Sequence, residues 1–271
     1  MVQDPNINER GYIYGKWMTK DDTYTISYGG AVYCYLLIGT EKALLIDTAY
    51  GDGNLRQYVE QITDKPVMVV NTHGHFDHTG GNAWWEEAYL SEPSSKDCKR
   101  AFSPEMVEEM KKKPFPDYKV NIVSEGYRFD LGGRTVEVID IPAHHDGSIA
   151  LLDSGSRYLF TGDELEAGQV LIFGNDALTR IAKHQRNMEK LKERSGDFDA
   201  ICPAHNGNPI NKKYVDDFIQ LDKKILAGTA QIMPTTAGFG FPPNASGFGP
   251  ARGRKVVRAQ YGDASICYML D

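Results

Sequence analysis

One short segment of this 271-residue chain carries four side chains that can bind a metal ion: His73, His75, Asp77 and His78. The segment follows the apolar run at residues 67–70 and lies just before Gly80 and Gly81, two glycines that allow a tight turn. Imidazole and carboxylate groups at this density suit a borderline cation such as zinc better than they suit a packed core. The segment is therefore predicted to be a metal site.

The remaining histidines test this interpretation, because the chain has only seven and they are not scattered. Side chains with metal-binding capacity also follow four other apolar runs, and they are Asp47, His144, His145, Asp163 and His205. The runs themselves cover residues 43–46, 136–141, 158–161 and 200–202. Polar groups at the ends of apolar strands tend to meet at one edge of a sheet, where α/β proteins bind ligands. We therefore expect these side chains to converge in space.

His184 is the one histidine outside these turns. It lies within residues 177–194, where Ile181, Met188 and Leu191 recur at helical spacing, and it shares their stripe. A histidine in that position is expected to be packed or half-buried, so His184 is left out of the site.

The pattern His73-x-His75-x-Asp77-His78, followed in order by His144, Asp163 and His205, resembles the metallo-β-lactamase superfamily. The resemblance covers most of the chain, from the strand pair near residues 33–48 to His205. It implies an α/β (α+β) fold of the αββα type, in which two mixed β-sheets are flanked by helices. The whole chain, residues 1–271, is expected to form a single domain of this kind.

The resemblance also implies a two-metal centre. The first metal would be held by His73, His75 and His144, and the second by Asp77, His78 and His205. Asp163 would bridge both metals, and Asp47 would orient a ligating imidazole by accepting its other N–H. Two zinc ions per chain are expected, with iron or manganese as alternatives.

A centre of this kind implies hydrolysis by a metal-bridging hydroxide. Asp77 is expected to steer the proton of the nucleophile toward the leaving group. His145 has two interpretations, since many relatives carry a threonine at its position. It is either a proton donor or substrate contact beside the metals, or a supporting or surface imidazole.

A small-molecule ester, lactone or thioester is the expected substrate. The well-known β-lactamases usually lack an aspartate at the position of Asp163, so in this respect the chain resembles the glyoxalase II, lactonase and phosphodiesterase members of the superfamily. The glutathione-binding pattern of glyoxalase II is not evident near His205. Three alternatives stay open: a mononuclear Fe(II) dioxygenase of the same fold, a hydrolase of β-lactams or phosphodiesters, and a noncatalytic scaffold stabilised by metal.

Composition sets broader limits on partners and compartment. The formal net charge is −7 and no basic tract stands out, so a nucleic-acid partner is not expected. No apolar run approaches membrane-spanning length, so no membrane association is expected either. The four cysteines are widely separated, as expected for reduced thiols in a cytoplasmic protein.

Alternating apolar residues and turn residues predict four strand pairs, at residues 32–38 with 42–47, 126–131 with 135–141, 149–153 with 157–161, and a closing hairpin at 255–270. Helical spacing predicts helices at residues 53–62, 82–89, 177–194 and 211–227. The last of these helices is expected to be capped by Asn211 and stopped by Gly228.

Two segments depart from a minimal version of the fold and are expected to decide specificity. Residues 91–121 form a polar insertion punctuated by prolines. Residues 233–250 are rich in glycine and proline and include three phenylalanines, which suggests a lid, an interface or a linker. Such aromatic residues in a loop also make a homodimer a candidate.

Overall fold

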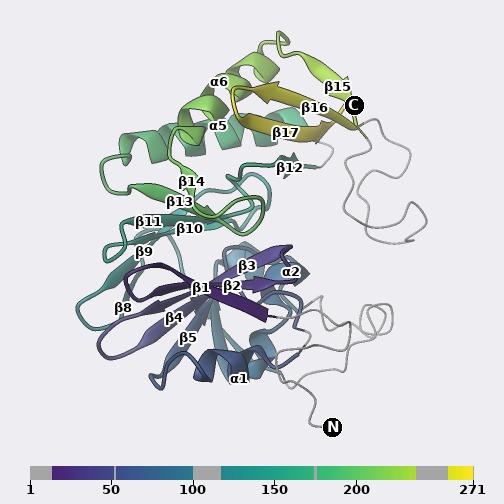
Figure 1. The fold of residues 1–271 in the computed structure, drawn as a ribbon. Helices are drawn as coiled ribbons and strands as arrows, with labels where there is room; N and C mark the ends of the chain where they lie inside the picture. Colours follow the sequence, from purple (N-terminus) through teal and green to yellow (C-terminus); the bar gives the residue numbers. More distant parts are fainter. Residues whose placement is uncertain (1–13, 52, 100–116, 174–175, 236–255, 271) are drawn as a thin grey trace.

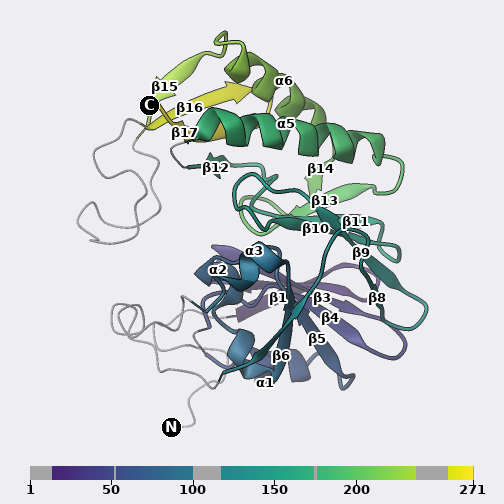
Figure 2. The same cartoon turned by 180° about the vertical axis from the view of Figure 1, so that it is seen from behind.

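Two β-sheets packed face to face form the centre of the protein, with helices on their outer faces (Figure 1, Figure 2). The computed structural model describes residues 14–51, 53–99, 117–173, 176–235 and 256–270. The arrangement confirms the αββα architecture expected from the sequence.

The first sheet has seven strands in the order of the chain. They are β1 (Tyr14–Lys20), β2 (Thr23–Tyr28), β3 (Val32–Ile38), β4 (Ala43–Ile46), β5 (Val67–Val70), β6 (Glu87–Leu90) and β7 (Lys119–Ile122). Strands β1 to β4 pair antiparallel, whereas β4 to β7 pair parallel. Helix α1 (Leu55–Glu60) covers the outer face with Leu55, Tyr58 and Val59.

The second sheet has six strands in the order β14-β13-β11-β10-β9-β8. They are β8 (Arg128–Asp130), β9 (Thr135–Asp140), β10 (Ile149–Asp153), β11 (Tyr158–Gly162), β13 (Ala200–Pro203) and β14 (Ile210–Asn211). Helices α5 (Ala177–Glu193) and α6 (Tyr214–Leu226) cover its outer face. Across the described ranges, no helix has both the length and the apolar character needed to cross a membrane.

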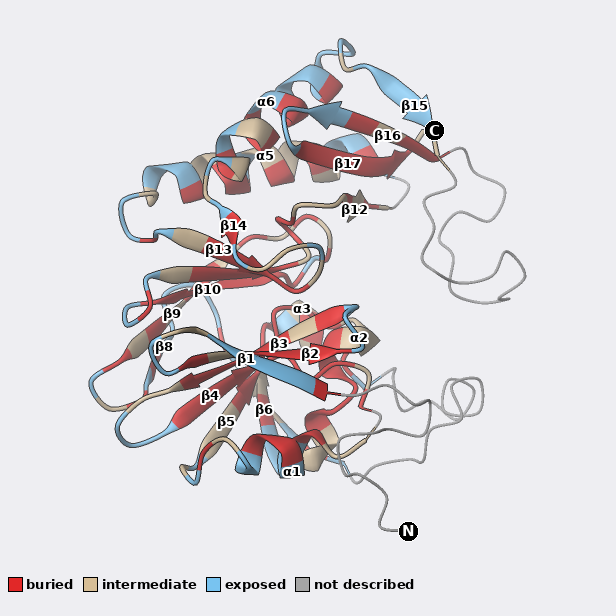
Figure 3. Ribbon diagram, in the orientation of Figure 1, coloured by how far each residue is buried: buried red, intermediate tan, exposed pale blue. Residues whose placement is uncertain are grey.

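The core between the two sheets is continuous and apolar. Tyr35, Ile46 and Val70 of the first sheet pack with Val138 and Phe160 of the second. The buried inner faces of both sheets are coloured red in Figure 3. Side chains alternate between the two faces of each strand. One set packs between the two sheets, and the other set packs against the helices on the outer faces.

A third sheet was not expected from the sequence. It has four strands, β12 (Val170–Ile172), β15 (Ile232–Pro234), β16 (Val256–Tyr261) and β17 (Ala264–Met269), in the order β12-β17-β16-β15. Val257, Ile266 and Tyr268 of this sheet join the core formed by α5 and α6. The predicted closing hairpin is therefore confirmed as β16 and β17. It packs against helices α5 and α6, which in turn pack on the second sheet.

Two predicted helices need correction. The helix predicted at residues 82–89 is wrong: only the short 3₁₀ helix η1 (Asn82–Trp84) forms there, and strand β6 begins at Glu87. Strand β6 pairs with β5 and β7, and this pairing depends on segments outside residues 82–89. Asn211 ends β14, and its side chain accepts the N–H of Lys213 in a turn instead of capping α6.

The two segments expected to decide specificity are only partly described. Residues 91–99 contain helix α3 (Glu92–Ser95), and Lys119–Ile122 forms edge strand β7, so both ends of the predicted insertion belong to the folded body. Of the glycine-rich segment, residues 236–250 lie outside the described residues.

Candidate metal centre

The predicted ligands lie at the carboxyl ends of four strands. His73, His75, Asp77 and His78 follow β5 of the first sheet; His75 is the N-cap residue of helix α2 (Phe76–Thr79), and Asp77 and His78 lie within it. His144, Asp163 and His205 follow β9, β11 and β13 of the second sheet, respectively. Strands β11 and β13 are parallel, and both β9 and β11 pair antiparallel with β10, so their carboxyl ends share one edge of the sheet. The expected convergence is confirmed.

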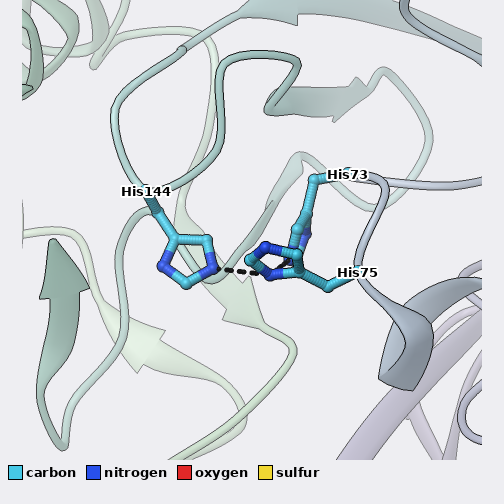
Figure 4. Close-up of side chains that lie close together, drawn as sticks. All are labelled: His73, His75 and His144. Atoms are coloured by element: carbon cyan, nitrogen blue, oxygen red, sulfur yellow. Dashed lines mark hydrogen bonds between the residues drawn. The ribbon is translucent and has the colours of Figure 1, made fainter. Parts of the chain in front are cut away.

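The first cluster consists of the imidazoles of His73, His75 and His144 (Figure 4). His75 Nδ1 lies 2.9 Å from His73 Nε2 and 3.1 Å from His144 Nε2. Three imidazole nitrogens thus point at one position from two different loops. This is the ligand geometry of a cation site.

The second cluster consists of Asp77, His78 and His205. Asp77 Oδ2 lies 3.6 Å from His78 Nε2 and 3.5 Å from His205 Nε2. One carboxylate oxygen and two imidazole nitrogens therefore face a second position beside the first.

Asp163 lies between the clusters and presents one carboxylate oxygen to each. Its Oδ1 is 3.3 Å from His78 Nε2 and 3.4 Å from His205 Nε2, in the second cluster. Its Oδ2 is 3.6 Å from His144 Nε2, in the first. This is the arrangement expected of a bridging carboxylate.

Two buried polar atoms of the centre have no hydrogen-bond partner among the described residues, which favours a metal ion as their partner. His78 Nε2 and Asp163 Oδ1 are shielded from solvent, and within the described part of the chain neither makes a hydrogen bond. An unsatisfied buried polar atom is costly, so such atoms in a native protein require an explanation. Nitrogen and carboxylate ligands aimed at two positions supply one, because they suit zinc, iron or manganese.

Three of the imidazoles are oriented by acceptors behind them. His78 Nδ1 lies 2.9 Å from Asp47 Oδ2, His144 Nδ1 lies 2.7 Å from the Leu171 carbonyl, and His205 Nδ1 lies 2.5 Å from the Ala31 carbonyl. Carboxylate and carbonyl oxygens only accept, so each Nδ1 donates its N–H to the group behind the ring, and each Nε2 is turned toward the centre. The supporting role predicted for Asp47 is consistent with this contact, as Asp47 also accepts from the backbone and hydroxyl of Thr72.

Electrostatics favours the neutral forms of His73 and His75 and the charged form of Asp77. Burial and the neighbouring imidazoles, His144 first, lower the pKa of His75 to about 3. Burial and the neighbouring His78 and His75 likewise hold the pKa of His73 well below its usual range. Burial alone would raise the pKa of Asp77, but His78 and His205 hold it at about 2. Neutral imidazoles and an ionised carboxylate are the ligating forms.

His145 is buried beside the centre, with its ring centroid 5.0 Å from that of His75, but its ring nitrogens contact other groups. Its Nε2 lies 3.0 Å from Asp97 Oδ2, and its Nδ1 accepts the N–H of Gly147 at 2.9 Å. The accepting Nδ1 fixes the tautomer, so Nε2 carries the proton and donates to Asp97. Both ring nitrogens are engaged by the protein in this conformation, and a direct catalytic role for His145 stays a prediction.

The sequence did not identify three groups that hold the ligands. Glu164 accepts backbone N–H groups around His144, and the carbonyls of Leu171 and Ala31 accept from ligand imidazoles. A carbonyl is present in every residue and carries no sequence signal. Glu164 could have been recognised, since an acidic residue follows Asp163 directly at the end of an apolar strand. His184 lies in the α5 core as expected, 5.3 Å from the Phe218 ring.

Sequence comparison agrees with this geometry. Residues 27–205, more than half of the chain, match the metallo-beta-lactamase superfamily. The chain belongs to the metallo-β-lactamase superfamily. A solved superfamily structure, the metallo-beta-lactamase from Pontibacter korlensis, shares the fold with a TM-score of 0.59 at 19% identity, over 78% of this chain and 99% of that one.

Two superfamily relatives have names that describe hydrolysis. The acyl-coenzyme A thioesterase MBLAC2 of Homo sapiens is 26% identical over 209 residues, which cover 65% of this chain and 74% of the relative. The cytoplasmic isozyme of hydroxyacylglutathione hydrolase from Saccharomyces cerevisiae is 31% identical over 198 residues, which cover 69% of this chain and 68% of the relative. The present chain is a metallo-hydrolase of this superfamily.

Proposed function

We propose that this metallo-hydrolase uses two metal ions, held on either side of Asp163, to hydrolyse small-molecule thioesters, with esters and lactones as related substrates. The observation that carries the two-metal part is the position of Asp163. Its two oxygens face two separate ligand clusters, each of which supplies three further ligands.

The substrate class is supported by the two relatives. One is named for acyl-coenzyme A thioesters, and the other for hydroxyacyl derivatives of glutathione. In both, an acyl group is removed from a thiol carrier. The matches cover 74% and 68% of the two relatives, so the substrate screen described below includes both thiol carriers.

Two bound cations would supply an acidified water molecule and polarise the carbonyl of the substrate. The residues of the chain hold and orient this chemistry. Asp77 presents its Oδ2 between His78 and His205, where its ionised carboxylate can accept a proton from the nucleophile and release it toward the leaving group.

The test is metal analysis followed by a substrate screen on protein purified without added metal. Two zinc ions per chain and release of free thiol from acyl-coenzyme A or acylglutathione substrates are expected, with slower hydrolysis of lactones, β-lactams and phosphodiesters. One iron per chain with oxygen uptake would contradict the proposal and favour the dioxygenase alternative. Iron or manganese in both positions with thioester hydrolysis would change the metal and keep the reaction.

We also propose that the protein works in the cytoplasm. All four cysteines, Cys34, Cys98, Cys202 and Cys267, are buried free thiols, and the yeast relative is named as a cytoplasmic isozyme. Fractionation of cells that express the tagged protein checks this, and recovery in a secreted or organellar fraction would contradict it.

A further inference from the structure

The loop that carries His144 is held from two sides by groups that touch neither metal position. On one side, Glu164 Oε1 accepts the backbone N–H groups of Ala143 at 2.9 Å, His144 at 2.7 Å and His145 at 3.4 Å. Three successive amides that meet one oxygen fix the backbone of the loop. Glu164 is fully buried and directly follows Asp163 in the chain.

On the other side, one face of α5 donates to carbonyls of the same loops. Asn187 Nδ2 lies 3.1 Å from the Pro142 carbonyl, and Arg180 Nη1 lies 3.0 Å from the Ala143 carbonyl. Between them, His184 Nε2 lies 2.8 Å from the carbonyl of Glu164 itself. Positions 180, 184 and 187 are four and three residues apart, so they share one helix face.

The helix face is itself anchored to the next helix. His184 Nδ1 lies 2.8 Å from Asp222 Oδ2 of α6, and both side chains are fully buried. A carboxylate and a carbonyl both accept, so the imidazole donates in two opposite directions and spans from α6 to the turn that contains Asp163.

We propose that Glu164, together with Arg180, His184 and Asn187 of α5, is a set of positioning residues that hold His144 and Asp163 in ligating geometry. The inference rests on the proposed two-metal function. Because three of these residues hold the backbone of the His144 loop, and His144 belongs only to the first cluster, the set controls chiefly the affinity of the first metal position, and with it the turnover number. Their contacts with the two ligand loops are made to backbone atoms, so substitutions are expected to leave substrate affinity unchanged.

The test compares Glu164→Leu with Glu164→Gln. Leucine removes the acceptor for the three N–H groups, whereas glutamine retains an oxygen at the same reach. Glu164→Leu is expected to lower the affinity for one of the two zinc ions by about 10- to 100-fold, measured by competition with a chromogenic chelator. It should also change the visible absorption bands of the cobalt(II) protein and lower kcat with little change in KM. Glu164→Gln is expected to keep zinc affinity and kcat within a few-fold of the wild type and to leave the cobalt(II) absorption bands unchanged.

Met188→Ala is the matched control, because Met188 is a buried α5 residue of the same core. It should lower the melting temperature while zinc affinity and the cobalt spectrum stay unchanged. If Glu164→Leu does not fold, Arg180→Met takes its place, since the Arg180 side chain is partly exposed whereas Glu164 is fully buried. Arg180→Met should weaken zinc binding by about tenfold.

The proposal would be overturned if folded Glu164→Leu or Arg180→Met had the zinc affinity and the cobalt spectrum of the wild type. It would also be overturned if Glu164→Gln lost as much zinc affinity and turnover as Glu164→Leu. The zinc and cobalt measurements require no substrate. Weaker zinc binding in a protein whose wild type cleaves none of the screened substrates would therefore support the positioning role and contradict the proposed substrate class.

Discussion

Asp77 is the ligand whose chemistry can be separated from its metal binding. Asparagine keeps an oxygen that can face His78 and His205, but it cannot accept a proton. Asp77→Asn is therefore expected to lower kcat by about 10²- to 10⁴-fold while metal content falls much less. Turnover of a thioester and metal content of the same preparation check this prediction.

Asp163→Asn serves as the comparison for that experiment. Asp163 faces both clusters, so its substitution should lower metal content and turnover together. A full turnover number in metal-loaded Asp77→Asn would rule out Asp77 as the proton carrier.

His184 gives the protein a pH-dependent contribution to stability on the alkaline side. Burial alone would lower the pKa of its imidazole, but the neighbouring Asp222 carboxylate raises the pKa from 6.5 to about 9. Because the folded value lies above the unfolded value, the contribution is complete below pH 6.5 and is lost as the pH rises through about 9.

Urea unfolding of the wild type and of His184→Gln at pH 6 and pH 10 measures this contribution. The wild type should exceed the variant by about 1–3 kcal/mol at the lower pH, the range for buried hydrogen bonds to charged groups, and by less at the higher pH. An equal difference at both pH values would show that the imidazole does not change charge in the folded protein.

At the scale of the elements, the two central sheets are joined by polar contacts at the end opposite the metal ligands. Arg134, just before β9, forms two hydrogen bonds of 2.8 and 2.6 Å with Asp153 at the end of β10. The same guanidinium donates to the carbonyls of Asp22 and Ile38, which belong to the first sheet's strand ends. Both charged side chains are buried.

Arg134→Ala should destabilise the protein by about 3–5 kcal/mol, because it leaves the Asp153 carboxylate buried without its partner. Arg128→Ala is the matched control. Arg128 pairs with Glu137 at the surface, 67% exposed, and its loss should cost about 1 kcal/mol or less. Equal losses in urea unfolding would contradict the structural role of Arg134.

The elements that the sequence predicts are those whose pattern is local. The hairpins β3–β4 and β16–β17 and helix α5 each carry their own alternation or helical stripe. Strands β6 and β12 have four residues or fewer and pair with segments far along the chain, so nothing within them distinguishes them from a turn. The convergence of the histidines was predictable for the opposite reason, since the chain has only seven and six of them follow apolar runs, whereas the choice of Asp77 and Asp163 rested on the resemblance to the superfamily.

At the scale of the whole molecule, the metals should contribute to stability because their ligands come from both central sheets. Free metal at about 1,000 times its dissociation constant adds about 4 kcal/mol to the folded state. For a chain of this size, chelation is therefore expected to lower the melting temperature by about 10 °C. Calorimetry of loaded and chelated protein measures the shift, and reloading with zinc should reverse it. Coincident melting curves would show that the ligands do not bind metal in the folded protein.

The division of each ligand set between two sheets also has a kinetic consequence. A chain whose sheets have not yet docked holds His73–His78 on one side and Asp163 and His205 on the other, so it cannot complete either cluster. Zinc should then act after the folding barrier: it should leave the refolding rate unchanged and slow unfolding. Metal would therefore lengthen the lifetime of each folded molecule without shortening the time needed to make one.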